Sequence, residues 1–100
     1  MRPTTTTATP DGATVKRTGN VYFADCYNHR VRKISPKGII NTVAGGGAGG
    51  VGDGGQATKA ELLGPTSVAV DGVGSLYIAE PRANRVRKVS PAGIITTVAG

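Results

Sequence analysis

The sequence predicts an all-β fold made of two tandem four-stranded antiparallel units. Strand-favouring Val, Ile and Thr are plentiful, and the 16 glycines among 100 residues supply tight turns between short strands. The chain also repeats itself, because residues 74–100 match residues 19–45 at 16 of 27 positions when the sequence is shifted by 55. A repeat of this length predicts that one supersecondary unit occurs twice.

The second copy shows the unit most clearly. Its β-branched and aromatic runs predict four strands, at residues 66–71, 75–80, 85–90 and 94–100. Turn residues separate them, at residues 72–74, 81–84 and 91–93. The four strands therefore follow one another as a meander.

The first copy predicts the matching strands at residues 21–25, 30–35 and 39–44, and its leading strand is weaker. Residues 10–16 fall in register with residues 65–71, which places that leading strand. Val31 and Ile34 lie three positions apart and cannot both face one side of a flat strand. Either a β-bulge or a strand buried on both faces would accommodate them.

Between the copies lies a glycine-rich linker. Residues 56–63, "QATKAELL", predict about two helical turns that end at Gly64 and Pro65. Before the first copy lies a low-complexity Thr tract that predicts disorder. The expected organisation is a disordered N-terminus at 1–9, a first unit at 10–45, the linker at 46–64 and a second unit at 65–100.

Several repeated residues have structural explanations. In Ser-Pro-x-Gly, proline presets φ for the turn and glycine accepts a positive φ. An acid before the second turn, with an arginine five positions later, predicts an ion pair that pins each hairpin, Asp25 with Arg30 and Glu80 with Arg85. Such a pair contributes at most about 1 kcal/mol if exposed. The residues assigned structural roles are Asp25, Glu80, Pro36, Gly38, Pro91 and Gly93.

The segments "GPTSVAVDGVGSLYIAEPRANRVRKV" and "TPDGATVKRTGNVYFADCYNHRVRKI" resemble the NHL-repeat family, as does the linker "GDGGQATKAELLGP". The family's acid is present as Asp25 but becomes Glu80, its asparagine at Asn28 becomes Ala83, and Lys16 replaces the acid of the leading strand. The resemblance implies that each unit is one blade of a β-propeller. Because a propeller closes with about 4–8 blades, two blades imply an incomplete one. The chain would be a fragment of a larger propeller, or three copies would form a six-bladed ring.

Basic residues suggest partners. The net charge is +6, and six of the twelve Lys and Arg residues lie in two "RVRK" tracts. This clustering raises the alternative of RNA binding, although only four aromatic residues are available to stack on bases. The candidate partner surface consists of Tyr27, Asn28, His29, Arg30, Arg32, Lys33, Arg82, Asn84, Arg85, Arg87 and Lys88.

Catalytic and cofactor signals are weak. A single cysteine, Cys26, and a single histidine, His29, cannot assemble a metal site or a catalytic triad. Gly45, Gly47 and Gly50 fit the dinucleotide fingerprint, but further glycines replace the helix that this motif requires. We therefore expect no cofactor, no metal and no enzymatic activity. The family resemblance leaves a third alternative, a fragment of a metal-dependent lyase propeller whose histidines lie on other blades.

The leading hypothesis is therefore a non-enzymatic binding module. The loops at residues 26–29 and 81–84 would present a surface to a protein or carbohydrate ligand. No run of about 18 apolar residues predicts a membrane span. The location stays open: exported if a signal precedes residue 1, cytoplasmic otherwise.

Overall fold

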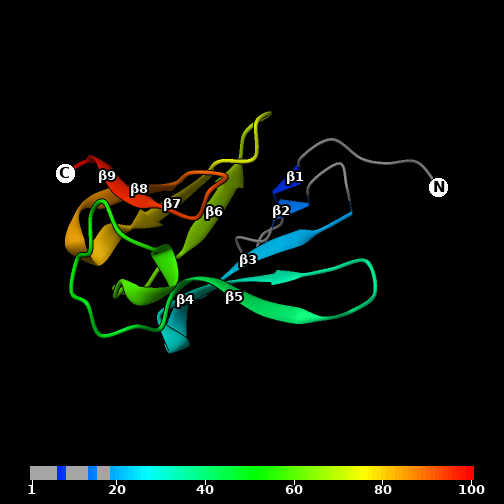
Figure 1. The fold of residues 1–100 in the computed structure, drawn as a ribbon, viewed down its shortest axis with the longest axis horizontal. Coiled ribbons are helices and arrows are strands. Elements are labelled where there is room, and N and C mark those ends of the chain that lie inside the picture. The colour runs from blue at the N-terminus through cyan, green and yellow to red at the C-terminus, as the bar shows by residue number, and fades with distance from the viewer. Residues whose placement is uncertain (1–6, 9–13, 16–18) are drawn as a thin grey trace.

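A computed structural model of the chain describes residues 7–8, 14–15 and 19–100. In these residues the strands form two antiparallel sheets, ordered β1-β2-β3-β4-β5 and β6-β7-β8-β9 (Figure 1). The elements are β1 (Thr7–Ala8), β2 (Thr14–Val15), β3 (Val21–Asp25), the 3₁₀ turn η1 (Cys26–Asn28), β4 (Arg30–Ile34), β5 (Ile40–Gly45), η2 (Ala57–Lys59), β6 (Ser67–Val70), β7 (Leu76–Glu80), η3 (Pro81–Ala83), β8 (Arg85–Val89) and β9 (Ile95–Ala99). The predicted all-β fold is confirmed.

Both sheets have the same strand register. Val15 lies opposite Val21 in the first sheet, and Val70 lies opposite Leu76 in the second, so both pairs are related by the sequence shift of 55. The weak leading strand of the first unit therefore pairs as its repeat position requires. Residues 10–13 and 16, the rest of that predicted strand, lie outside the described residues.

A β-bulge interrupts the outer strand pair of each sheet. The register shifts between Val31 and Arg32 in the first sheet, and between Val86 and Arg87 in the second. In the first sheet the extra residue is Val43 on β5. The structure therefore contains the bulge, one of the two alternatives that the sequence left open.

The two sheets pack face to face. Val31 and Ala44 of the first sheet are fully buried, and the second sheet buries the face that carries Ile78. Removal of this apolar surface from water is the main stabilising contribution. The core consists of Val31, Ala44, Ala57, Ala60, Leu62, Val68, Val70, Leu76, Ile78, Val89 and Ile95.

The linker differs from its prediction. Of residues 56–63, only Ala57–Lys59 form a 3₁₀ turn, η2, and the backbone is already extended at Ala60 (ψ 159°). Instead, the beginning of the linker pairs with its later part. Gly47 N–H donates to the carbonyl oxygen of Ala60, and Gly49 N–H donates to that of Lys59. These bonds occupy the carbonyl groups of Lys59 and Ala60, which a second helical turn would have used as acceptors.

The start of the chain also differs. Thr7 and Ala8 fall within the tract predicted to be disordered, yet they form β1 and pair with β2. An edge strand offers unpaired backbone groups, which explains why even a Thr-rich segment can pair there. Residues 1–6 and 9 lie outside the described residues.

The turns follow the repeat. Gly38 and Gly93 both adopt φ of 85°, and each donates its N–H to the serine three residues earlier, at 2.8 Å. Over residues 7–8, 14–15 and 19–100 the chain holds no helix with the length and apolar character needed to cross a bilayer.

Candidate functional site

Two loops occupy the same position in the two units. η1 follows β3 and η3 follows β7, and each loop ends in a residue with left-handed backbone, His29 (φ 55°) and Asn84 (φ 54°). Histidine and asparagine tolerate this conformation better than most residues. We name five of the exposed residues of the two loops the loop face: Tyr27, Asn28, His29, Arg82 and Asn84.

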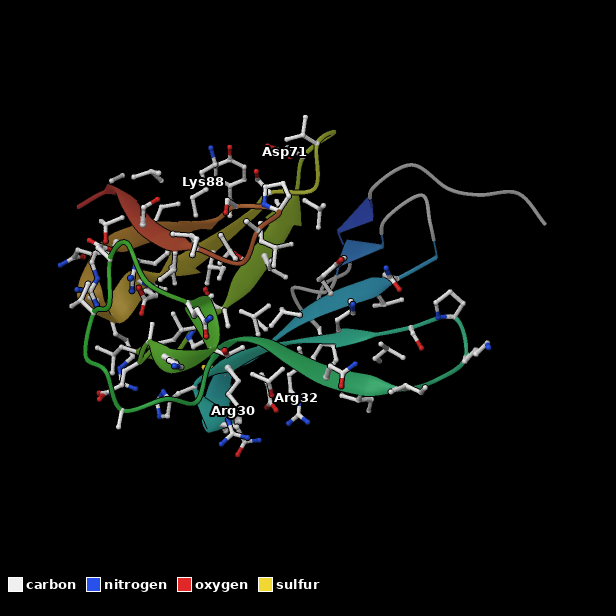
Figure 2. The ribbon with its side chains drawn as sticks, viewed as in Figure 1. Arg30, Arg32, Asp71 and Lys88 are labelled. Atoms are coloured by element: carbon white, nitrogen blue, oxygen red, sulfur yellow. The ribbon has the colours of Figure 1, made fainter. Side chains whose placement is uncertain are left out.

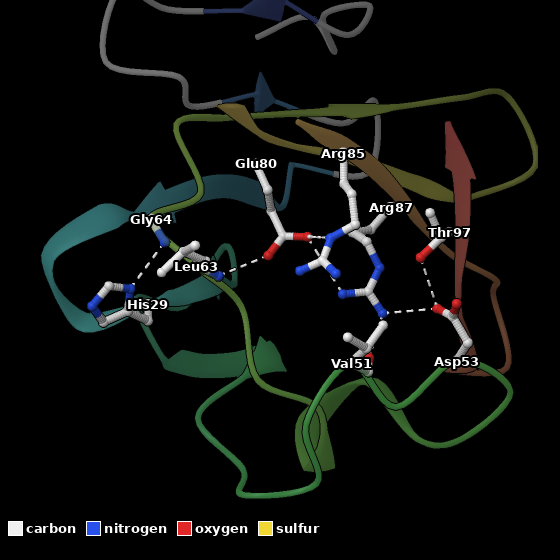
Figure 3. Close-up of polar contacts among 9 residues, drawn as sticks. All are labelled: His29, Val51, Asp53, Leu63, Gly64, Glu80, Arg85, Arg87 and Thr97. Atoms are coloured by element: carbon white, nitrogen blue, oxygen red, sulfur yellow. Dashed lines mark hydrogen bonds and ion pairs between the residues drawn. The ribbon is translucent and has the colours of Figure 1, made fainter. Parts of the chain in front are cut away.

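Gly64 joins these loops. Its N–H donates to Nδ1 of His29 at 2.9 Å (Figure 3). A Cβ on Gly64 would lie 3.2 Å from Cδ of Arg82 and 3.8 Å from Sγ of Cys26, so side chains of both loops surround this glycine. The end of the linker therefore holds the two loops beside each other.

Asp25 supports the first loop. Nδ2 of Asn28 donates hydrogen bonds to both oxygens of its carboxylate, at 3.1 and 3.0 Å. The carboxylate also lies 3.6 Å from Nη1 of Arg32. The predicted ion pair of Asp25 with Arg30 is therefore wrong, and Arg32 is the partner. Arg30 lies directly across from Asp25, but its side chain runs beside Gly46 at the start of the linker.

Glu80 is the repeat counterpart of Asp25 but is fully buried. Its Oε1 lies 3.5 Å from Nε of Arg85 and 3.4 Å from Nη1 of Arg87, and its Oε2 accepts the N–H of Leu63 at 2.7 Å. The predicted pair of Glu80 with Arg85 is present. It belongs to a buried network, not to an exposed hairpin.

Arg87 corrects the predicted partner surface, because this side chain is fully buried. Its Nη2 donates to the carbonyl oxygen of Val51 and lies 2.9 Å from Oδ1 of Asp53 (Figure 3). Thr97 Oγ1 donates to the same Asp53 oxygen at 3.0 Å. Arg87 therefore ties the linker to the second sheet, and its guanidinium faces the protein interior.

Sequence reasoning missed Asp53. The linker was expected only to connect the units, and its one aspartate among glycines attracted no role. The signal that could have found it was the combination of the linker's single aspartate with an arginine at the same repeat position in each unit. Whether a strand arginine meets that acid depends on how the linker folds over the sheet.

The two basic tracts do not form one continuous surface. Arg30 and Arg32 lie on one side of the molecule, whereas Lys88 lies on the opposite side (Figure 2). Lys88 Nζ sits 5.8 Å from the centre of the Tyr77 ring. Lys33 lines a cavity of about 230 Å³ whose walls come from both sheets. The half-buried Arg85 points toward Glu80.

Asp71 caps the turn between β6 and β7. Its Oδ1 accepts the N–H groups of Ser75 at 2.9 Å and Val73 at 3.1 Å, and its Oδ2 lies 3.3 Å from the Tyr77 hydroxyl. The Ser75 bond is the main cause of a pKa lowered from the ordinary 3.8. Asp71 therefore acts as a turn residue, and both its oxygens are engaged.

Metal ligands do not gather in the described part of the chain, where no group of three or more His, Cys, Asp or Glu side chains could hold an ion.

A hollow of about 230 Å³ opens beside the loop face and is lined by His29, Gly46, Gly47, Glu61 and Leu62. Its two polar side chains, His29 and Glu61, could orient a ligand group.

Known proteins similar to the chain include teneurins. It is 36% identical over 104 residues to Teneurin-3 of Danio rerio, and this alignment covers 88% of the chain and 4% of that protein. It is 32% identical over 82 residues to Protein SUPPRESSOR OF QUENCHING 1, chloroplastic, of Arabidopsis thaliana, covering 80% of the chain and 8% of that protein. The chain thus spans less than a tenth of the length of these relatives.

Structural comparison agrees on the fold. The crystal structure of selenomethionine-substituted virginiamycin B lyase from Staphylococcus aureus, a β-propeller, superposes with a TM-score of 0.65. The superposition covers 100% of the chain and 30% of the lyase at 17% sequence identity, which supports the fold alone. The family model described as the Teneurin NHL domain matches residues 46–100. The chain therefore belongs to the NHL-repeat family, and its two sheets are two blades of an open β-propeller.

Proposed function

We propose that the chain is a non-enzymatic binding module, part of a larger propeller, whose loop face docks onto an acidic protein surface. The observation that carries this proposal is Tyr27, whose side chain is 96% exposed. Exposed aromatic residues on an ordered support are frequent anchors of protein interfaces. Tyr27 stands on such a support, because its neighbour His29 is bound to Gly64.

Charge supports an acidic partner. The chain carries a net charge of +6, and Arg82 adds an exposed guanidinium beside the first loop. Arginine and tyrosine together dominate the binding energy of many interfaces. Positive charge around them accelerates encounter with an acidic surface.

The contacts of the loop face favour binding over catalysis. His29 is the single histidine of the chain, and its Nδ1 accepts a hydrogen bond from the backbone. Because Nδ1 accepts this bond, the neutral ring carries its hydrogen on Nε2, and neither nitrogen is then left to accept a proton from a substrate. The same contact that withdraws Nδ1 from chemistry gives the loop a defined shape for recognition.

The RNA hypothesis receives less support from the contacts. Arg87 is buried, Arg32 and Arg85 face carboxylates, and Lys88 lies over an aromatic ring on the other side from Arg32. Phosphate binding requires several free cations along one surface. The basic tracts thus act mainly within the blades.

The test is selection of random peptides displayed on phage against the full chain. We expect enrichment of peptides that combine Asp or Glu with an apolar residue, and Tyr27→Ser weakens their binding about tenfold or more. Arg82→Ser also weakens it, whereas Lys37→Ser, which removes an exposed charge from the distant turn after β4, does not. Equal binding by all three variants would contradict the proposal.

Two further arms separate the other ligand classes. Single-stranded RNA is titrated in filter binding at about 50 mM salt, where phosphate contacts are strong. A glycan array tests carbohydrates with the same variants. Tight RNA or glycan binding without peptide enrichment would replace the proposed protein partner.

A further inference from the structure

The repeat places the same polar group on both blades. On β4 of the first blade and on β8 of the second, an arginine lies beside the bulge and opposite a threonine of the next strand, β5 or β9. An acidic side chain lies near each arginine. The group consists of Glu80, Arg87 and Thr97 in the second blade and of Asp25, Arg32 and Thr42 in the first.

In the second blade this group binds the linker. Asp53 contacts Arg87 at 2.9 Å and Thr97 at 3.0 Å, and Arg87 also bonds to the carbonyl oxygen of Val51. The linker therefore gives Nη2 of Arg87 two acceptors, a carboxylate oxygen and a backbone carbonyl oxygen. The linker thus supplies acceptors for Arg87 that the strands of the blade do not provide.

The linker also pairs with the backbone of the same blade. Gly54 N–H donates to Ile95 at 2.7 Å, Ile95 N–H donates to Gly55 at 3.0 Å, and Ala57 N–H donates to Gly93 at 2.8 Å. Ile95 is fully buried beneath it. The carboxylate of Asp53 and these backbone hydrogen bonds therefore hold the linker against the second blade together.

The first blade has this surface without its cover. Ile40, the counterpart of Ile95, is 50% exposed, and the Arg32 side chain is 27% exposed. Among the residues that the structure describes, the Arg32 guanidinium pairs only with Asp25, whereas that of Arg87 meets Glu80, Val51 and Asp53. Within residues 7–8, 14–15 and 19–100, Arg32 has no counterpart of Asp53.

We propose that this open face of the first blade is a docking site for a second glycine-rich segment that carries one aspartate, of the same kind as residues 51–57. The segment adds to the edge of β5, places its carboxylate between Arg32 and Thr42, and covers Ile40. Its glycines matter as much as its acid. Gly52 and Gly54 flank Asp53 with φ of 69° and 86°, values that other residues rarely adopt.

The test titrates a synthetic peptide of residues 50–58, "GVGDGGQAT", into the ¹⁵N-labelled full chain, up to about 5 mM because short segments act at millimolar effective concentration. We expect the amide signals of Arg32, Ile40 and Thr42 to shift with peptide concentration. A matched peptide with Asn in place of the aspartate should bind about tenfold more weakly, because it loses a charge-assisted hydrogen bond.

Two variants of the chain locate the site. Arg32→Gln should abolish the β4 and β5 shifts, and Thr42→Val should weaken binding severalfold, while unchanged signals from β6 to β9 report an intact fold. Shifts confined to β8 and β9 would mean that the peptide only displaces the chain's own linker. That result, equal affinity of the Asn peptide, or no shift at the highest concentration would overturn the proposal.

The docking site and the loop face are connected through Asp25, which contacts both Arg32 and Asn28, but Tyr27 takes part only in the loop face. Tyr27→Ser should leave peptide binding at β5 unchanged, because Tyr27 lies outside the group of Asp25, Arg32 and Thr42. Failure of the peptide titration would therefore leave the proposed partner surface standing, and the converse also holds.

Discussion

Replacement of Glu80 by glutamine removes a negative charge from the interior of the second blade. Glu80→Gln preserves the size of the side chain and one oxygen that can still accept the N–H of Leu63. It leaves Arg87 fully buried, with Asp53 as its remaining carboxylate, and that side chain is 47% exposed. The charges of Arg85 and Arg87 then face each other without a carboxylate between them.

The expected loss of stability follows from burial. Removing one partner of a buried ion pair destabilises by about 3–5 kcal/mol, and the retained oxygen places Glu80→Gln near the lower end, about 3 kcal/mol. Asp25→Asn is the matched change in the first blade, where Asp25 and Arg32 are 24% and 27% exposed and 3.6 Å apart. An exposed pair of this kind contributes about 0–1 kcal/mol.

Urea unfolding followed by far-ultraviolet circular dichroism and by the fluorescence of the three tyrosines measures both variants. The free energy of unfolding should fall about 2 kcal/mol further for Glu80→Gln than for Asp25→Asn. Equal losses in the two variants, with unchanged denaturant dependence, would refute the argument that linker coverage makes the second pair different.

Further predictions concern the packing, the pH dependence and the linker. Ile95→Ala should lower the free energy of unfolding by about 2–5 kcal/mol and Ile40→Ala by less than about 1 kcal/mol, because only Ile95 is fully buried; urea unfolding compares them. The lowered pKa of Asp71 means that its contribution to stability is present above about pH 4 and is lost as the pH falls through the folded-state pKa. The difference in melting temperature between the wild type and Asp71→Asn should therefore shrink on acidification, and a constant difference would contradict it. Gly47→Ala should prevent closure of the linker, because its Cβ would overlap the Lys59 backbone, whereas Gly54→Ala meets no atom within 4 Å and carries only backbone strain; limited proteolysis of the linker distinguishes them.

Local patterns were enough to predict most of the fold. The shift of 55, the turn glycines and the β-branched runs predicted two four-stranded units whose registers coincide. These features depend on residues close in sequence, where turn chemistry and strand propensity act. The loops with Tyr27 and Arg82 were predicted for the same reason, because loops between short strands lie at the surface.

The different burial of the two identical "RVRK" tracts could not be predicted from such local patterns. Arg32 and Arg87 occupy the same repeat position, yet the side chain of Arg32 is partly exposed and that of Arg87 is buried against Asp53. The sequence by itself determined the strands, the turns and the doubled blade, since these follow from short-range geometry. Only the tertiary structure decided which blade the linker covers. That choice determines burial, and burial determines whether an arginine binds within the protein or remains available to a partner.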